Sequence, residues 1–238
     1  MGFAHGSHQQ TIVAAAQRNA LLALKDRGVL AGCIDLYSYR ADYNRNKMVE
    51  KLQDMPPDVT WLGMLDDDVI PHKDALAKQW ERAELSNADI YCALVFQGNG
   101  YPNVFTQYTG VKVAEYGLQT PAFEFALNPV YAWLEEFKMW DKAPPWCLDQ
   151  AAETSLLTIQ AAGTAGMFVH RRLFEKVGPP WFNFEYGSSE DVYFCEKARY
   201  FNPRIVVDLS ICHGHLRERC IGPDAFKKVV DKLNREDT

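Results

Sequence analysis

The chain has 238 residues, of which 47% are hydrophobic and 24% charged, and its formal net charge at pH 7 is −6. This composition is typical of a globular α/β protein with a sizeable core, and the negative charge argues against general nucleic-acid binding. No apolar stretch reaches the length of about 20 residues that a membrane span needs, and no signal-peptide pattern opens the chain. Six scattered cysteines without a CxxC pair favour a reducing compartment, so we expect a cytoplasmic protein.

Strand and helix patterns alternate along the first part of the chain. Either residues 3–5 are the remnant of a first strand, or the true start of that strand has been trimmed. The elements expected after them are helix 11–27, strand 33–37, helix 43–53, strand 59–65, helix 74–84 and strand 90–96. Such alternation indicates βαβ units with right-handed crossovers and a mainly parallel sheet flanked by helices.

The pattern changes at residue 97. Aromatic residues, glycines and prolines dominate 97–149, which predicts long irregular loops, and such loops are usually functional. Regular structure is expected again at 156–169, helix 172–176, helix 189–200, strand 204–209 and an amphipathic helix 223–234. We expect a single domain over residues 1–238.

Three adjacent carboxylates, Asp66, Asp67 and Asp68, follow the apolar strand 59–65 directly. They therefore lie at the carboxyl end of a buried strand, which is the edge where open α/β sheets bind their ligands. Adjacent carboxylates repel one another, and a hard divalent cation such as Mg²⁺ or Mn²⁺ would cancel that repulsion. A polar turn that is rich in acids would give the same pattern, so the choice between a metal site and a polar turn depends on the motifs further along the chain.

Two helix starts carry further candidate residues. Arg45 lies near the start of helix 43–53, where free N–H groups and the positive end of the helix dipole suit a phosphate, although a solvated arginine is the simpler interpretation. Glu190 and Asp191 follow the turn 187–189 at the start of another helix. Acids there are favourable with the dipole in any case, and one of them could also act as general base on an acceptor hydroxyl.

Two histidines, His213 and His215, follow strand 204–209 with a glycine between them. A histidine after a strand is often structural, but a neutral imidazole beside an acidic strand end is also a credible metal ligand. Side chains alternate along an extended segment, so the two histidines should point to opposite faces. We expect His215 to be the one that faces the metal.

The order of these segments resembles that of GT-A glycosyltransferases, in particular the non-processive family 2-like members. Asp66–Asp68 is similar to the DXD signature, and Arg45-Asn46 to the arginine–asparagine pair that precedes the acidic strand in many of them. Glu190-Asp191 is similar to the ED motif, and His215 to a histidine near the end of the domain. The stretch 163–172 lies between the acidic strand end and Glu190-Asp191. The resemblance spans residues 30–220.

The resemblance implies a single GT-A (Rossmann-like) domain, in which 11–97 form the nucleotide-binding half, 98–222 the acceptor-binding and catalytic half, and 223–238 a C-terminal helix. It implies a UDP- or GDP-sugar donor, with the diphosphate bound through Mn²⁺ or Mg²⁺. The implied metal ligands are Asp68, Asp66 and His215, and the implied donor-binding residues are Arg45, Asp66, Asp67, Gly163 and Gly166.

The acceptor implied by the resemblance is a glycan or another molecule with a free hydroxyl. Asp191 would deprotonate that hydroxyl and give inversion of the anomeric centre. Glu190 would position the acceptor through a hydrogen bond, and Trp181 would stack beneath it.

The chain departs from the family pattern at both ends. The first strand is short, which leaves the nucleobase site in doubt, and no QxxRW-type motif follows the histidines, which argues against a processive polysaccharide synthase. A nucleotidyltransferase is an alternative, but its usual GxGxR-type loop is absent. A second alternative is a carbohydrate-binding protein of the same fold that catalyses no reaction. The joint presence of Asp68, Asp191 and His215 speaks against this alternative.

Overall fold

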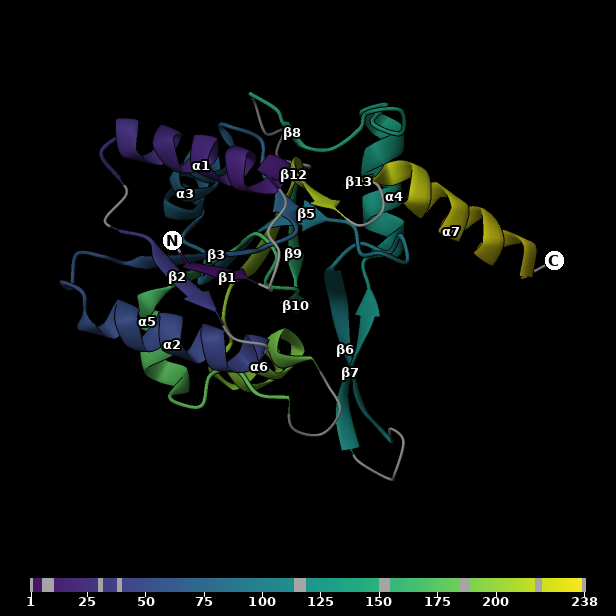
Figure 1. Cartoon of the computed structure of the whole chain (residues 1–238). Coiled ribbons are helices and arrows are strands. Elements are labelled where there is room, and N and C mark those ends of the chain that lie inside the picture. Colours follow the sequence, from purple (N-terminus) through teal and green to yellow (C-terminus); the bar gives the residue numbers. More distant parts are fainter. Residues whose placement is uncertain are drawn as a thin grey trace.

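The computed structural model describes residues 2–5, 11–29, 32–37, 40–113, 119–149, 155–184, 189–216 and 220–236. Figure 1 shows the arrangement of its elements. The helices are α1 (Thr11–Asp26), α2 (Ala41–Asp54), α3 (Ala75–Ser86), α4 (Leu127–Glu136), α5 (Arg171–Val177), α6 (Glu190–Ala198), the 3₁₀ helix η4 (Arg199–Phe201) and α7 (Pro223–Glu236). The strands are β1 (Gly2–His5), β2 (Ile34–Tyr37), β3 (Trp61–Asp66), β4 (Val69–Ile70), β5 (Ile90–Val95), β6 (Val104–Val113), β7 (Gln119–Phe125), β8 (Trp146–Cys147), β9 (Leu156–Ile159), β10 (Ala161–Ala162), β11 (Met167–His170), β12 (Ile205–Leu216) and β13 (Cys220–Ile221).

The first three strands form a parallel unit, as the alternating pattern predicts, and β5 and β12 form a further parallel pair. β1 pairs in parallel with both β2 and β3, and α1 and α2 are the crossovers between them. Residues 2–5 therefore form a short strand at the centre of this unit.

The prediction of a mainly parallel sheet is wrong. The large sheet has the order β13-β12-β5-β11-β3-β1-β2. β11 lies between β3 and β5 and runs antiparallel to both, and β4, β8, β9 and β13 all pair antiparallel with β12. Helical crossovers fix the direction of β1, β2, β3 and β5, whereas β11 enters the sheet from a stretch without such a crossover, so the alternating pattern gave no information on its direction.

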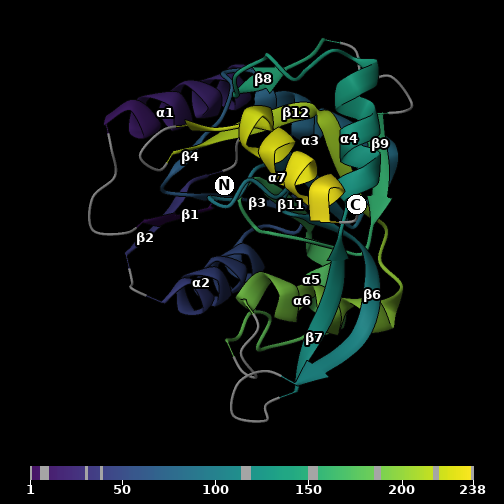
Figure 2. The same cartoon turned by 90° about the vertical axis from the view of Figure 1, so that its right-hand side faces the viewer.

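The prediction of irregular loops over 97–149 is also wrong. This stretch contains the hairpin β6–β7, the helix α4 and the short strand β8, and β6 and β7 form a second sheet with β10. The aromatic residues stabilise the hairpin through cross-strand pairs: the ring centroids of Phe105 and Phe125 lie 4.7 Å apart, and those of Tyr108 and Phe123 lie 5.3 Å apart. Figures 1 and 2 show the hairpin running away from the large sheet, past α6.

Helices cover both faces of the large sheet, with α1 and α3 on one face and α2, α5 and α6 on the other (Figure 1). The side chains of β3 supply both cores in alternation. Leu62 and Met64 pack with α2 and α5, whereas Trp61 and Leu65 pack with α1 and α3. This two-residue period is what a central strand with two covered faces requires.

Strand β12 is longer than the predicted strand 204–209 and includes both histidines. Its pairing with β5 shifts register between Asp208 and Cys212, where the chain bulges. The buried carboxylate of Asp208 fixes this bulge, since it accepts hydrogen bonds from Arg82 (2.7 Å) and from the hydroxyl of Tyr91 (2.9 Å). Beyond the bulge β12 continues to the edge where β3 ends.

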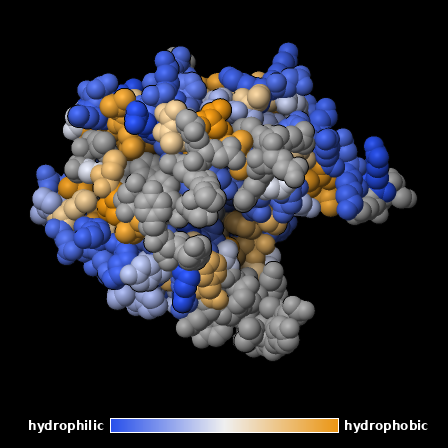
Figure 3. Space-filling model, in the orientation of Figure 1, coloured by the Kyte–Doolittle hydropathy of each residue, from blue (hydrophilic) through white to orange (hydrophobic). Residues whose placement is uncertain are grey.

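The C-terminal helix α7 joins the body through its first turns. Phe226 is buried, and its ring lies against those of Phe96 and Trp140. The far end of α7 leads away from the body (Figure 1) and carries mostly hydrophilic side chains (Figure 3). In the part of the chain that the structure describes, no helix combines the length and the apolar character that crossing a membrane requires.

Candidate active site at the carboxyl edge of the sheet

The turn with the three acids is held from two sides. β3 ends at Asp66, and Asp67 and Asp68 lead into β4; all three acids are partly exposed. Gln17 of α1 donates its side-chain amide to the carbonyl oxygens of Asp66 (2.8 Å) and Val69 (3.1 Å). On the other side β4 pairs antiparallel with β12. The carboxylates therefore keep a fixed place at the edge of the sheet.

Asp68 and His215 face each other across this edge. The Nε2 atom of His215 lies 3.1 Å from Oδ2 of Asp68, and its Nδ1 lies 2.9 Å from the carbonyl oxygen of Phe96. A carbonyl oxygen only accepts hydrogen bonds, so Nδ1 carries a proton and donates it there. Histidines that bind metals are usually oriented in this way, with the second ring nitrogen bonded to a carbonyl or carboxylate.

His213 points away from the acids, as the alternation along the strand predicts. Its side chain is fully buried, and burial lowers its pKa to about 3 because the charged form is poorly solvated there. Among the described residues neither of its ring nitrogens has a hydrogen-bond partner. His213 is therefore a neutral core residue.

Gly166 packs against that buried ring. A Cβ atom at Gly166 would lie 2.4 Å from Cδ2 of His213, and the φ of Gly166 is +89°. Both observations explain why only glycine fits here. The sequence predicted that Gly166 would let the backbone approach the donor. In the structure, the absence of a side chain at Gly166 makes room for the buried ring of His213.

Arg45 is buried between two carboxylates. It is 4% exposed, its Nη2 lies 2.8 Å from Oδ1 of Asp66, and its Nη1 forms an ion pair with Glu190, which is 6% exposed. The guanidinium expected to bind a phosphate, and the carboxylate expected to position an acceptor, therefore bind each other. Neither residue is open to a ligand in this arrangement.

Asp191 is the partly exposed acid at the start of α6. It lies beside Gly163, where a Cβ atom would be 3.2 Å from Oδ2 of Asp191 and 3.3 Å from Nδ2 of Asn103. Asn103 is buried and belongs to the site without having been predicted, because it lies in the stretch that read as loop and no local pattern marks it. Gly187 and Ser188, predicted in the turn before α6, lie outside the described residues.

The electrostatics of Asp66 show how closely these groups gather. Burial raises its pKa, although 31% of its side chain is exposed. The positive charge of Arg45 opposes this shift, the carboxylates of Asp68 and Asp191 add to it, and His215 opposes it. Groups from β3, α2, α6 and β12 thus act on one carboxylate.

Trp181 is a core residue. It is 4% exposed, and its indole N–H donates to the carbonyl oxygen of Phe174 at 2.8 Å. A ring buried on both faces cannot stack beneath a sugar, so the structure argues against the role in acceptor binding that the sequence predicted.

The residues at this edge fit a divalent cation only in part. Among the described residues, no group of three or more histidine, cysteine, aspartate or glutamate side chains is arranged to hold a metal ion. Asp68 and His215 could supply two ligands, an oxygen and a nitrogen; the oxygen is of the kind that Mn²⁺ or Mg²⁺ prefers, and phosphate oxygens and water could fill the remaining positions.

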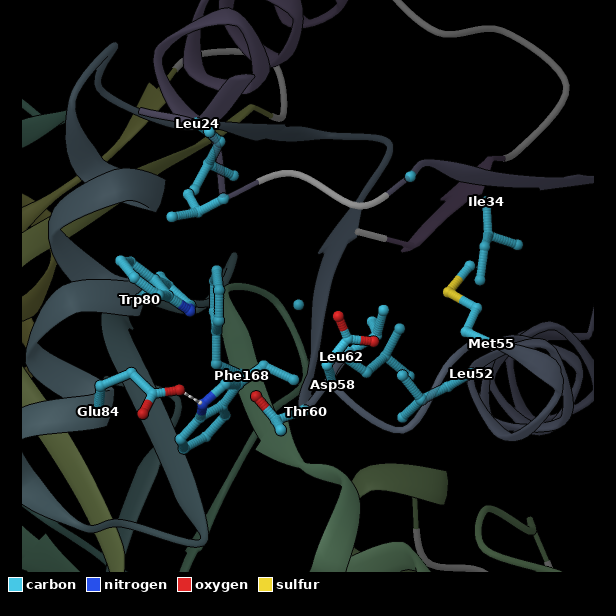
Figure 4. Close-up of a pocket in the computed structure, with 16 residues that line it drawn as sticks. Leu24, Ile34, Leu52, Met55, Asp58, Thr60, Leu62, Trp80, Glu84 and Phe168 are labelled. Carbon is cyan, nitrogen blue, oxygen red and sulfur yellow. Dashed lines mark hydrogen bonds between the residues drawn. The ribbon is translucent and has the colours of Figure 1, made fainter. Parts of the chain in front are cut away.

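The cavity in Figure 4 lies at the opposite end of β3. Its volume is about 660 Å³, and Leu24, Ile34, Leu62, Trp80 and Phe168 are among its mostly apolar lining residues. Each of the acids Asp66–Asp68 lies outside this lining. We therefore place the candidate site at the acidic edge of the sheet and not in this cavity.

Comparison with known proteins supports the fold. No protein-family model and no curated protein matches the sequence. Among solved structures, A197 from STIV is similar with a TM-score of 0.58 and 17% identity, covering 94% of this chain and 90% of A197. At that identity the likeness shows the fold alone.

Two crystal structures of S. aureus TarS also match, each with a TM-score of 0.45 and 13% identity. The match covers 89% of this chain and 58% of the 1–349 form of TarS, and 96% of this chain and 38% of the longer form. The mixed α/β fold is therefore the property that this chain shares with A197.

Proposed function

We propose that this chain is a metal-dependent glycosyltransferase that moves a sugar from a UDP- or GDP-sugar to the hydroxyl of a glycan or another acceptor. The observation that carries the proposal is the meeting of Asp66, Asp68, Asp191 and His215 at one sheet edge, although they come from three segments that lie far apart in the sequence. The mixed α/β fold that the chain shares with A197 is compatible with it.

On the donor side, Asp68 and His215 would hold Mn²⁺ or Mg²⁺, with Asp66 and Asp67 beside them. When bound, the cation would neutralise the charge that develops on the leaving nucleoside diphosphate. Nε2 of His215 and Oδ2 of Asp68 lie 3.1 Å apart and both side chains are partly exposed, so the two atoms could bind the same cation from the solvent side.

On the acceptor side, Asp191 would take the proton of the acceptor hydroxyl. As that proton leaves, the acceptor oxygen bonds to the anomeric carbon and the bond from that carbon to the diphosphate oxygen breaks. A single base on the face opposite the leaving group gives inversion. Gly163 leaves the approach to Asp191 open, because it has no Cβ.

The proposal is tested by incubating the protein with a panel of UDP- and GDP-sugars in Mn²⁺ or in EDTA. We expect metal-dependent release of UDP or GDP from one donor, and loss of that release in Asp68→Ala. Asp149→Ala is a matched control, because Asp149 is an exposed acid paired with Lys78.

Two results would contradict the proposal. Formation of a nucleotide sugar and pyrophosphate from a nucleoside triphosphate and a sugar phosphate would make the chain a nucleotidyltransferase. Binding of glycans without any binding or turnover of nucleotide sugars would make it a non-catalytic carbohydrate-binding protein.

A further inference from the structure

Two consecutive residues of α2 hold the segment that leads to the proposed general base. Asn46 accepts hydrogen bonds at Oδ1 from the backbone N–H groups of Trp181 (2.9 Å) and Phe182 (3.2 Å), and its Nδ2 donates to the carbonyl oxygen of Phe182 (2.7 Å). Arg45 forms its ion pair with Glu190 in the first turn of α6. The chain before Asp191 is thus attached to α2 through the backbone of residues 181–182 and through the side chain of Glu190.

Arg45 also reaches the donor side of the site. Its two terminal nitrogens bind different acids, Nη1 that of Glu190 and Nη2 that of Asp66 at the end of β3. A guanidinium can do this because its donors are fixed in a planar fork, whereas the ammonium of a lysine is a single point. One side chain therefore connects the strand with the acids to the helix with Asp191.

Because the contacts of Arg45 with Asp66 and Glu190 are buried, losing one of them is costly. Arg45 and Glu190 are almost fully buried, so a Glu190 carboxylate without its partner would be a poorly solvated charge. It would also lie close to Asp66, and the two negative charges would repel each other. Both effects would push the first turn of α6 away from the end of β3, and Asp191 would move with it.

We propose that Arg45 is a positioning residue that fixes Asp191 relative to the donor-binding edge, and that it is not a ligand of the donor phosphates. This inference rests on the proposed function, since it assigns Arg45 a role through the proposed base. It predicts that a change at Arg45 reduces transfer to the acceptor without weakening donor binding.

The test compares Arg45→Lys with Arg172→Lys. Arg172 is also a partly buried arginine that binds more than one acceptor, namely the carboxylate of Asp89 and the carbonyl oxygen of Ala88, but it lies on α5, at the end of the sheet where β5 begins. Three quantities are measured: the dissociation constant of UDP or GDP in Mn²⁺, the kcat of transfer at saturating donor, and the amide hydrogen exchange of Val192 and Tyr193 in α6.

In Arg45→Lys we expect an unchanged dissociation constant, a kcat lower by at least about tenfold, since small displacements of a reacting group are costly, and exchange of the two α6 amides faster by about tenfold or more. Arg172→Lys should change none of the three. A dissociation constant raised by about tenfold or more, with kcat and exchange preserved, would overturn the inference and make Arg45 a phosphate ligand. The inference is also overturned if the two variants show the same dissociation constant, kcat and amide exchange.

The exchange measurement separates this inference from the proposed function. If the wild-type protein neither binds nor turns over a nucleotide sugar, the proposed function fails. The exchange of Val192 and Tyr193 then decides alone whether Arg45 fixes the first turn of α6, and unchanged exchange overturns that as well.

Discussion

Nε2 of His215 and Oδ2 of Asp68 lie 3.1 Å apart, although 147 positions separate the two residues in the sequence. The contact exists because β12 continues past its bulge to pair with β4, directly after the acidic turn. A hydrogen bond from the backbone N–H of Leu216 to the carbonyl oxygen of Asp68 (2.8 Å) holds the two segments in register. The imidazole and the carboxylate are thus positioned by backbone contacts.

The first prediction concerns His215. In His215→Ala the affinity for UDP or GDP in Mn²⁺ should fall by at least about tenfold, because one of the two proposed metal ligands is lost. Isothermal titration calorimetry in Mn²⁺ and in EDTA measures this. His72→Ala is the control, since His72 lies against Asp74 at 3.7 Å and faces neither Asp68 nor Phe96. Equal wild-type affinity in Mn²⁺ and in EDTA would disprove the metal site.

The sequence predicted the order of elements well where each strand is followed by a helix. The strands and helices from 11 to 96 lie within a few residues of their predicted bounds. It failed at β11 and at the hairpin β6–β7, where no helical crossover fixes the direction of the strand and where aromatic residues read as loop. Pairing between strands far apart in sequence is a tertiary property that a local pattern does not contain.

For the candidate site, the sequence identified several of the residues that gather, but it missed Asn103 and did not show which residues remain open. Asp68 and His215 face each other, and Asp191 stays partly exposed. Arg45, Glu190 and Trp181 are buried by partners. Burial depends on packing between α2, α5 and α6, and neither helix periodicity nor motif spacing predicts it.

The second prediction concerns Gly166. Gly166→Ala should lower the free energy of unfolding by about 2–4 kcal/mol, because the new methyl group would collide with the ring of His213 and because φ is positive. Gly28→Ala is the control: φ is +70°, but no atom lies within 4 Å of the new Cβ, so only the backbone strain of about 1 kcal/mol remains. Urea denaturation of both variants measures the difference. Equal losses would show that the ring of His213 moves aside freely.

The third prediction concerns the pH dependence of stability. The pKa of His213 is lowered from 6.5 to about 3 by burial, so below pH 6.5 the unfolded chain binds a proton that the folded protein does not. This contribution to stability is complete above pH 6.5 and is lost as the pH falls toward 3. His213→Leu removes it, so its free energy of unfolding should fall less steeply than that of the wild type, by about 1.4 kcal/mol per pH unit. Parallel curves would show that His213 is protonated in the folded protein.

The last prediction concerns Asp191, the acid of α6 that remains partly exposed while the neighbouring Glu190 is bound by Arg45. Asp191→Asn keeps the size of the side chain and removes its basicity, so donor binding should stay unchanged while transfer falls by at least about 100-fold, the usual effect of losing a general base. Initial rates with saturating donor, together with calorimetry of the nucleotide, separate the two effects. Glu196→Gln, at an acid of the same helix that binds Arg199, should keep transfer at the wild-type rate. If Asp191→Asn keeps the wild-type rate of transfer too, another group takes the proton.

The stereochemistry of transfer is tested by the NMR signal of the product's anomeric proton. A base opposite the leaving group requires inversion, so a product with the anomeric configuration of the donor would refute the inverting mechanism.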